Sequence, residues 1–271
     1  MSIRCVIAGA LAASLALLSG CETVNTTAPG AVGIEREQKM LVSEEDIEKG
    51  AAQAYAQELN KARKQGTLNK NKEDVARVRR ISERLIPQVA VFRPDALNWD
   101  WEINVQASKE LNAYCMPGGK IMVYSGLIHQ LDLSDAELSS VIGHEISHAL
   151  REHSRECISH AYAQQLAIVG VAAVAGVGAG VADLANQVAT VTFQLPHSRE
   201  QEAEADRMGL ELMARAGYDP NAAVTLWRKM GKASSGGPPE FLSTHPSGDS
   251  RIEDLQKNIP RVMPLYDEAK G

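Results

Sequence analysis

The residues best suited to do chemistry in this sequence are two histidines and a glutamate, His144, Glu145 and His148. On a helix, the two histidines lie about 40° apart around the axis and about 6 Å apart along it, so both rings can reach one ion. Zinc accepts imidazole nitrogens and carboxylate oxygens, and a catalytic site leaves one position for water. Glu145 can take a proton from that water, whose pKa zinc lowers to about 7. The pattern predicts a zinc site for hydrolysis.

The helix that carries this motif has its own signals. Ser134 and Glu137 form a capping box, which predicts a helix from residue 134 to about 152. Ile142 and Ile146 give it an apolar face, so the motif should lie beside the core. A buried histidine pair without a metal would be costly, which argues against a chance occurrence of the motif.

A third ligand must come from elsewhere in the chain. A metzincin would have glycine at position 151 and histidine at 154, and the presence of Arg151 and Ser154 excludes that class. His153 is one residue out of this register and is expected to face solvent.

An acid-rich helix start at residues 198–206 offers the strongest candidates for the third ligand. Glu202 and Asp206 lie one helical turn apart on one face, which suits one as a ligand and the other as the acceptor that orients a ligand histidine. Glu200 and Glu204 are interpreted as acids that complement the helix dipole.

His245 stands in a Thr-His-Pro sequence and has three possible roles. It could stabilise the tetrahedral oxyanion, fill the water position as a fourth ligand in a latent form, or pack in a loop against Pro246. His129, His160 and His197 carry no motif and are expected to be structural or exposed.

The remaining patterns predict a mostly helical α+β domain with a small antiparallel or mixed sheet beside the motif helix. Strands are expected at 99–105 and at 120–124, the second one after a Pro-Gly-Gly turn. Helices are expected at 43–66, 73–86, 134–152, 198–216, 220–231 and 250–258.

The N-terminus has the features of a targeting segment, with an apolar run after Arg4. Residues 1–20 are predicted to be a signal peptide. Leu18-Ser19-Gly20-Cys21 resembles the bacterial lipoprotein box, which implies lipidation of Cys21; an ordinary secretory signal with a chance cysteine is the alternative. Residues 21–42 are then a flexible tether and 43–271 the domain. The residue after Cys21 is Glu22 and not aspartate, which by resemblance to enterobacterial lipoprotein sorting favours the outer membrane over the inner.

Composition narrows the partners. The net charge of -6 and the absence of a basic stripe argue against nucleic acid.

The uncharged stretch 163–182 is rich in alanine and glycine, which favours a buried hairpin or a mobile flap over a membrane span. Cys115 and Cys157 could form a disulfide or remain free thiols.

Four ordered segments resemble the HtpX and CAAX-endoprotease family of gluzincin metallopeptidases, and especially its periplasmic lipoprotein branch with BepA-like and LoiP-like members. The match extends over about residues 73–258 and rests on the segments 112–127, 143–148, 198–206 and 244–251. The resemblance implies a zincin-like fold and one Zn²⁺ per chain. It also implies that His144, His148 and Glu202 are the ligands, that Glu145 is the base and that Asp206 is a supporting acid.

The family pattern further implies that residues 112–123, beginning at Asn112 and Ala113, form a strand beside the site. An extended peptide could add to this strand by main-chain hydrogen bonds, with weak side-chain specificity. Cys115 departs from the apolar residue expected there.

The leading hypothesis is an endopeptidase that cleaves unfolded or misassembled envelope proteins, tethered by lipid at the periplasmic face of the outer membrane. Outer-membrane assembly machinery is a further candidate partner. The alternatives are a chaperone or assembly factor with little or no turnover, and a zinc amidase acting on cell-wall peptides.

Overall fold

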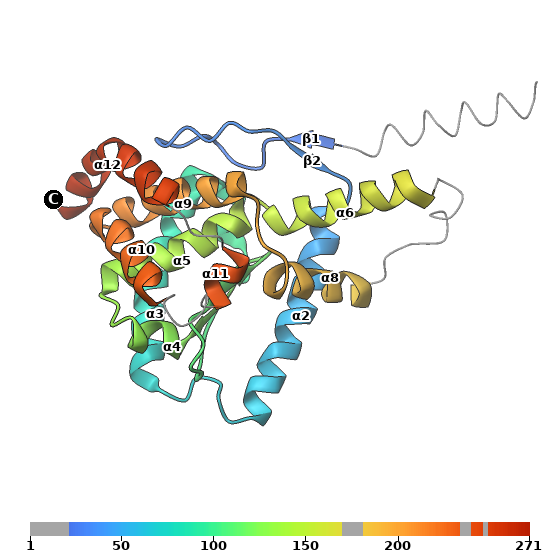
Figure 1. The fold of residues 1–271 in the computed structure, drawn as a ribbon, viewed down its shortest axis with the longest axis horizontal. Coiled ribbons are helices and arrows are strands. Elements are labelled where there is room, and N and C mark those ends of the chain that lie inside the picture. Colours follow the sequence, from blue (N-terminus) through green and yellow to red (C-terminus); the bar gives the residue numbers. More distant parts are fainter. Residues whose placement is uncertain (1–21, 170–180, 234–239, 246–248) are drawn as a thin grey trace, which may run out of the picture.

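The computed structural model describes residues 22–169, 181–233, 240–245 and 249–271, and it confirms the mostly helical α+β class. Figure 1 shows helices packed on both sides of a small sheet. The described strands are β1 (Glu22–Val24), β2 (Gln38–Met40), β3 (Glu102–Gln106), β4 (Ala113–Met116) and β5 (Lys120–Tyr124). The described helices are α2 (Glu44–Lys64), α3 (Lys72–Leu85), α4 (Ser125–Gln130), α5 (Asp135–Leu150), α6 (His153–Val169), α8 (Val181–Phe193), α9 (Arg199–Arg215), α10 (Asn221–Ala233), α11 (Glu240–Thr244) and α12 (Asp249–Lys270), with short 3₁₀ helices η1 (Ile86–Val91) and η2 (Pro94–Asn98).

The main sheet is mixed, in the order β3-β5-β4. β3 runs parallel to β5, and β4 runs antiparallel to it across the predicted turn, where Gly118 and Gly119 have φ of 76° and 82°. Such positive φ values favour glycine because it has no Cβ. The predicted strand at 120–124 is confirmed, and the one predicted at 99–105 lies at Glu102–Gln106.

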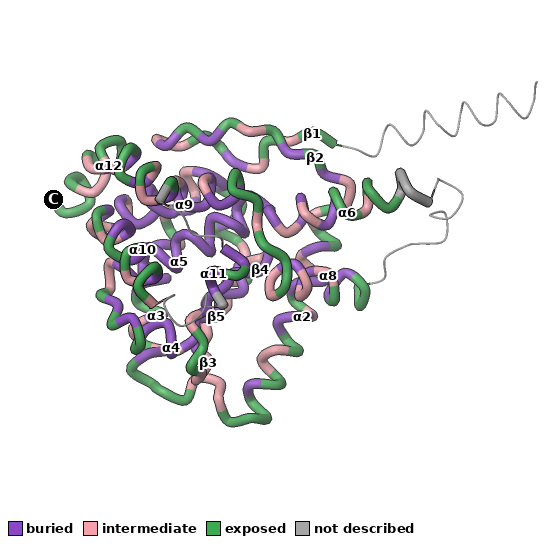
Figure 2. The backbone as a smooth tube through the Cα atoms, in the orientation of Figure 1, coloured by how far each residue is buried: buried purple, intermediate pink, exposed green. Residues whose placement is uncertain are grey.

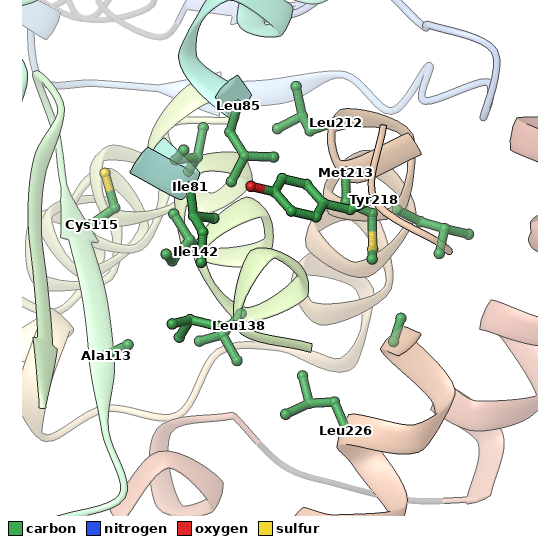
Figure 3. Packing of buried hydrophobic residues seen from close by; sticks show 14 of the residues in the cluster. Ile81, Leu85, Ala113, Cys115, Leu138, Ile142, Leu212, Met213, Tyr218 and Leu226 are labelled. Atoms are coloured by element: carbon green, nitrogen blue, oxygen red, sulfur yellow. The ribbon is translucent and has the colours of Figure 1, made fainter. Parts of the chain in front are cut away.

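The sheet lies between two layers of helices, because apolar side chains on both of its faces are buried. On β4, Ala113 and Cys115 belong to the core cluster with α3, α5, α9 and α10, whereas Tyr114 and Met116 pack with α2 and α8. This alternation is the two-residue period of a strand. Figure 3 shows Ile142 of α5 and Met213 of α9 in the first of these clusters.

The helices α5 and α9 form the centre of the domain and hold most of the predicted site residues, namely His144, Glu145, His148, Glu202 and Asp206. Their backbones meet closely at Gly143 and Gly209, where a Cβ added to Gly209 would lie 2.8 Å from the backbone nitrogen of His144. The capping boxes at Ser134 and at Ser198 fix where these two helices begin. Glycine at the contact therefore brings α9 close enough to α5 for their side chains to share one site.

Residues 22–42, called the strap below, were predicted to be a flexible tether, and the structure corrects this. Figure 2 shows buried stretches along the strap, where Val32 is 1% and Gln38 is 0% exposed. The backbone nitrogen of Ala28 donates to the carbonyl oxygen of Phe92 at 2.8 Å, and that of Val32 donates to Glu211 Oε2 at 3.1 Å. The folded domain therefore includes residues 22–42 as well as the part from residue 43 on, because the strap has apolar and polar contacts of its own with the domain.

Three further sequence predictions concern the N-terminal segment, the apolar stretch and the two cysteines. The predicted signal peptide at residues 1–20 and the predicted lipidation site Cys21 lie outside the described residues. The same holds for residues 170–180 of the apolar stretch 163–182. None of the described helices is long and apolar enough to cross a membrane. Cys115 and Cys157 are free thiols, so the disulfide alternative is wrong for this structure.

Candidate metal centre

Four buried side chains from three helical segments converge on one point. His144 and His148 come from α5, Glu202 comes from the first turn of α9, and His245 directly follows α11. One ligand atom from each lies within 4.8 Å of all the others. The structure therefore brings together the predicted ligands and the histidine whose role the sequence left open.

The spacing of these atoms matches the size of a tetrahedral zinc site. Bonds of about 2.0 Å at tetrahedral angles place neighbouring ligand atoms about 3.3 Å apart. The two Nε2 atoms of His144 and His148 are 3.0 Å apart, and His148 Nε2 lies 3.3 Å from Glu202 Oε1. His245 Nδ1 lies 3.3 Å from His144 Nε2 and 2.9 Å from Glu202 Oε1. This set of three imidazoles and one carboxylate suits zinc in both chemistry and dimensions.

Glu145 is buried next to this cluster and is not part of it. Its Oε1 has no hydrogen-bond partner in the described part of the chain, and His245 Nε2 lies 3.6 Å away. Burial raises the pKa of Glu145, because the charged carboxylate has lost its water. A buried carboxylate oxygen without a partner is the feature expected of a group that receives a proton during a reaction.

Asp206 lies behind His144, on the side away from the cluster. Its Oδ1 is 3.0 Å from His144 Nδ1, and Arg251 donates to the same carboxylate through Nε at 2.6 Å and Nη2 at 2.7 Å. Burial acts to raise the pKa of Asp206, but Arg251 and His144 lower it, so the group is charged. A charged acceptor at Nδ1 leaves His144 Nε2 free to bind a metal.

His148 has a partner that was not foreseen, and two predictions are corrected here. His153, expected to face solvent, is fully buried with its Nδ1 2.8 Å from His148 Nδ1. Glu204, interpreted as an acid that complements the helix dipole, accepts from His153 Nε2 at 3.0 Å and pairs with Arg36 and Arg151. Burial opposes ionisation, yet His153 and the arginines lower the pKa of Glu204 to about 2. Glu200, interpreted in the same way, lies exposed in the first turn of α9.

His197 also lies at the site, although it belongs to no recognisable motif. Its ring stacks on His148 with centroids 4.1 Å apart, and its backbone nitrogen donates to the carbonyl oxygen of Thr244 at 3.0 Å. Burial lowers its pKa to about 3. The available signal was its position directly before Ser198, the cap of the helix that holds Glu202. His160 is exposed, and His129 bonds to Asp74.

The segment predicted to be one substrate-binding strand, residues 112–123, forms two strands, β4 and β5, that pair antiparallel. β4 packs against α5, the helix that carries His144 and His148. The carbonyl oxygen of Asn112 accepts from Tyr124 N, and Ala113 begins β4, which is an edge of the described sheet. The backbone nitrogen of Phe241, in α11, donates to the carbonyl oxygen of Leu111 at 3.1 Å. The segment that carries His245 is therefore attached to the start of this strand.

Comparison with known proteins identifies a matching family and several similar proteins whose names describe them as proteases. The family described as Peptidase family M48 matches residues 72–259, which is more than half of the chain. Mitochondrial metalloendopeptidase OMA1 of Arabidopsis thaliana is 42% identical over 63% of this chain, and that of Schizosaccharomyces pombe is 36% identical over 60%. The beta-barrel assembly-enhancing protease of Escherichia coli is 33% identical over 58%. The matched regions cover 34%, 48% and 34% of these relatives, so the chain spans half of their length or less.

Proposed function

The chain belongs to peptidase family M48, and from this membership and the geometry of the metal centre we propose that it is a zinc-dependent metalloendopeptidase. The family predicted from the sequence is thereby confirmed. The observation that carries the proposal is the buried cluster of His144, His148, Glu202 and His245 with the unpartnered Glu145 Oε1 beside it. Zinc is the ion expected in this family, and His144, His148 and Glu202 are the proposed ligands.

Each residue then has a defined part in the hydrolysis of a peptide bond. When bound, zinc would polarise the scissile carbonyl and make the attacking water more acidic. Glu145 takes the proton from that water and passes it to the nitrogen of the leaving amine, as a general base and then a general acid. Asp206 holds the proton of His144 on Nδ1, which leaves Nε2, on the side of His148 and His245, as the atom that would bind the ion.

His245 occupies a position that supports the latent form over the oxyanion role. Its Nδ1 is within 2.9 Å of Glu202 Oε1 and its Nε2 is 3.6 Å from Glu145 Oε1, so it lies between a proposed ligand and the proposed base. Water must occupy this space during turnover. We infer that His245 acts as a fourth ligand and that the structure represents a closed state of the enzyme.

We propose unfolded or misassembled envelope proteins as substrates and a lipid tether at the periplasmic face of the outer membrane. Support comes from the lipoprotein box at Cys21, from Glu22 after it, and from one relative named as a beta-barrel assembly-enhancing protease. Such a location would place outer-membrane assembly machinery within reach as a partner.

The tether has a direct test. Cells that express the chain with labelled palmitate should incorporate label into the wild type and not into a Cys21→Ala variant, because acylation requires that thiol. Equal labelling of the two proteins, or no label in either, would rule out the anchor.

The peptidase and the chaperone hypotheses differ in their need for metal. The zinc-loaded protein should cleave an unfolded protein substrate, lose this activity with a chelator and regain it with zinc. The reason is that the metal would lower the pKa of the attacking water. Fragments are separated by electrophoresis, and aggregation of the same substrate is followed by light scattering. Suppressed aggregation without cleavage, unchanged by chelator, would favour the chaperone. Cleavage of cell-wall peptides alone would favour the amidase.

A further inference from the structure

We propose that His153, Glu204 and Arg36 form a positioning relay for the metal ligand His148, and that the N-terminal strap is thereby a working part of the metal centre. The inference rests on the proposed zinc-dependent function and extends it to residues outside the ligand set. Arg36 belongs to the strap, far in the sequence from the motif helix.

The relay follows from the hydrogen-bonding needs of the two rings. If His148 faces the metal with Nε2, its Nδ1 carries the proton and must donate it to an acceptor. The atom within reach is His153 Nδ1, at 2.8 Å. Nδ1 of His153 accepts only if the proton of that ring is on Nε2, which lies 3.0 Å from Glu204 Oε2. One tautomer of each ring therefore satisfies both bonds, and it is the tautomer that zinc binding requires of His148.

Glu204 determines which way the protons point in this series of hydrogen bonds, because its negative charge is held in place. Arg36 donates to Glu204 through Nε and Nη2, each at 2.9 Å, and Arg151 Nη2 lies 3.2 Å from the same carboxylate. Arg36 is held in turn by Glu156, to which Nη2 donates at 2.9 Å. A carboxylate fixed by two guanidinium groups is a firm acceptor for His153.

The two histidine ligands are thus supported in different ways. His144 is oriented by Asp206 and Arg251, which lie within the region that matches the family. His148 is oriented through one more residue, and the chain of contacts ends on Arg36, outside that region. The strap is also held by Arg151, whose Nη2 donates to the carbonyl oxygen of Arg36 at 2.9 Å. A change in how the strap is seated would therefore reach the orientation of His148.

Zinc affinity of the full chain tests the relay, measured by competition with a chromophoric chelator. Loss of a partner that orients a ligand typically weakens metal binding by about 10- to 100-fold. We expect this loss in His153→Phe, which keeps a ring but cannot accept or donate, and a loss of about tenfold in Arg36→Met, where Arg151 still holds Glu204. The visible absorption of the cobalt-loaded protein should change in His153→Phe because His148 can rotate.

Arg77→Met is the matched control. Arg77 is 25% exposed against 23% for Arg36, and it pairs with Asp135 at the opposite end of α5, away from the site. The control should keep the zinc affinity and cobalt spectrum of the wild type. Circular dichroism of the metal-free proteins shows which variants fold. If His153→Phe does not fold, the zinc affinity of Arg36→Met decides the question, because the Arg36 side chain is partly exposed and its replacement disturbs the core less.

Failure of the relay and failure of the proposed function give different results. Wild-type affinity in His153→Phe and in Arg36→Met, with tight zinc binding by the wild type, would overturn the relay and leave the function intact. Equal loss of affinity in Arg77→Met would also overturn it, because the effect would then be a general loss of stability. If the wild type binds zinc no better than Glu202→Gln, the zinc function itself fails.

Discussion

Replacing Glu145 by glutamine is expected to lower kcat/KM for an unfolded protein substrate by about 10²- to 10⁴-fold, the usual contribution of a general base. Glutamine has nearly the same shape but cannot take a proton from water. Glu145 lies outside the four-residue cluster, so the variant should keep its zinc. It should also remain folded, since the variant removes a buried charge whose Oε1 has no hydrogen-bond partner among the described residues.

The measurement combines steady-state kinetics with the zinc content of the same preparation. A variant that loses activity and keeps one zinc per chain identifies Glu145 as the base. A variant that loses zinc together with activity would show that Glu145 supports the metal instead. Cleavage at the wild-type rate by the zinc-loaded variant would remove Glu145 from the mechanism.

The parts of the fold that were predictable from the sequence depend on local signals. Capping boxes at Ser134 and Ser198 fix the starts of α5 and α9, and the one-turn spacing of His144 and His148 places both on one face of a helix. The Gly118-Gly119 turn indicates where β4 and β5 reverse. These signals need only neighbouring residues, so the sequence carries them fully.

The corrected predictions concern contacts between distant segments. His153 looks solvent-facing when judged by the metzincin spacing. It is buried because Glu204 of α9 accepts from its Nε2 and His148 of α5 lies within hydrogen-bond distance of its Nδ1. Arg36 lies in a polar segment that resembles a tether, and only the folded structure pairs it with Glu156 and Glu204. Composition reports the average character of a segment. The ion pairs of Arg36 with two buried acids, together with the buried side chains of Val32 and Gln38, hold this segment on the domain.

The free thiols show the same limit from another direction. Cys115 lies on β4 within the core, and Cys157 lies on α6 in contact with Gln201. Burial raises the pKa of both thiols, which leaves them as weak nucleophiles. The number of cysteines left two possibilities open, and the arrangement of the helices resolves them.

Replacing His245 by alanine is the experiment that decides how the site is regulated, and we expect kcat/KM to rise. In the closed state, His245 fills the space beside Glu145 and Glu202, and the hydrogen bond from Phe241 N to the Leu111 carbonyl holds α11 against the start of the substrate strand. A protein whose active form is a minor state of about 10% or less gains about tenfold or more when the competing contact is removed. The expected gain is therefore at least about tenfold in kcat/KM.

The opposite sign identifies the other role of His245. If its imidazole stabilises the oxyanion, His245→Ala lowers kcat by about 10²- to 10³-fold, as loss of one such donor does. His129→Ala is the control, because His129 is 58% exposed and bonds only to Asp74 among the contacts described for it. Both variants are assayed at equal zinc loading, since a fourth ligand also contributes to affinity. A rise in kcat/KM together with weaker zinc binding identifies His245 as a ligand that must leave the metal before water can bind. An oxyanion donor would not compete with that water, so its removal would not raise kcat/KM.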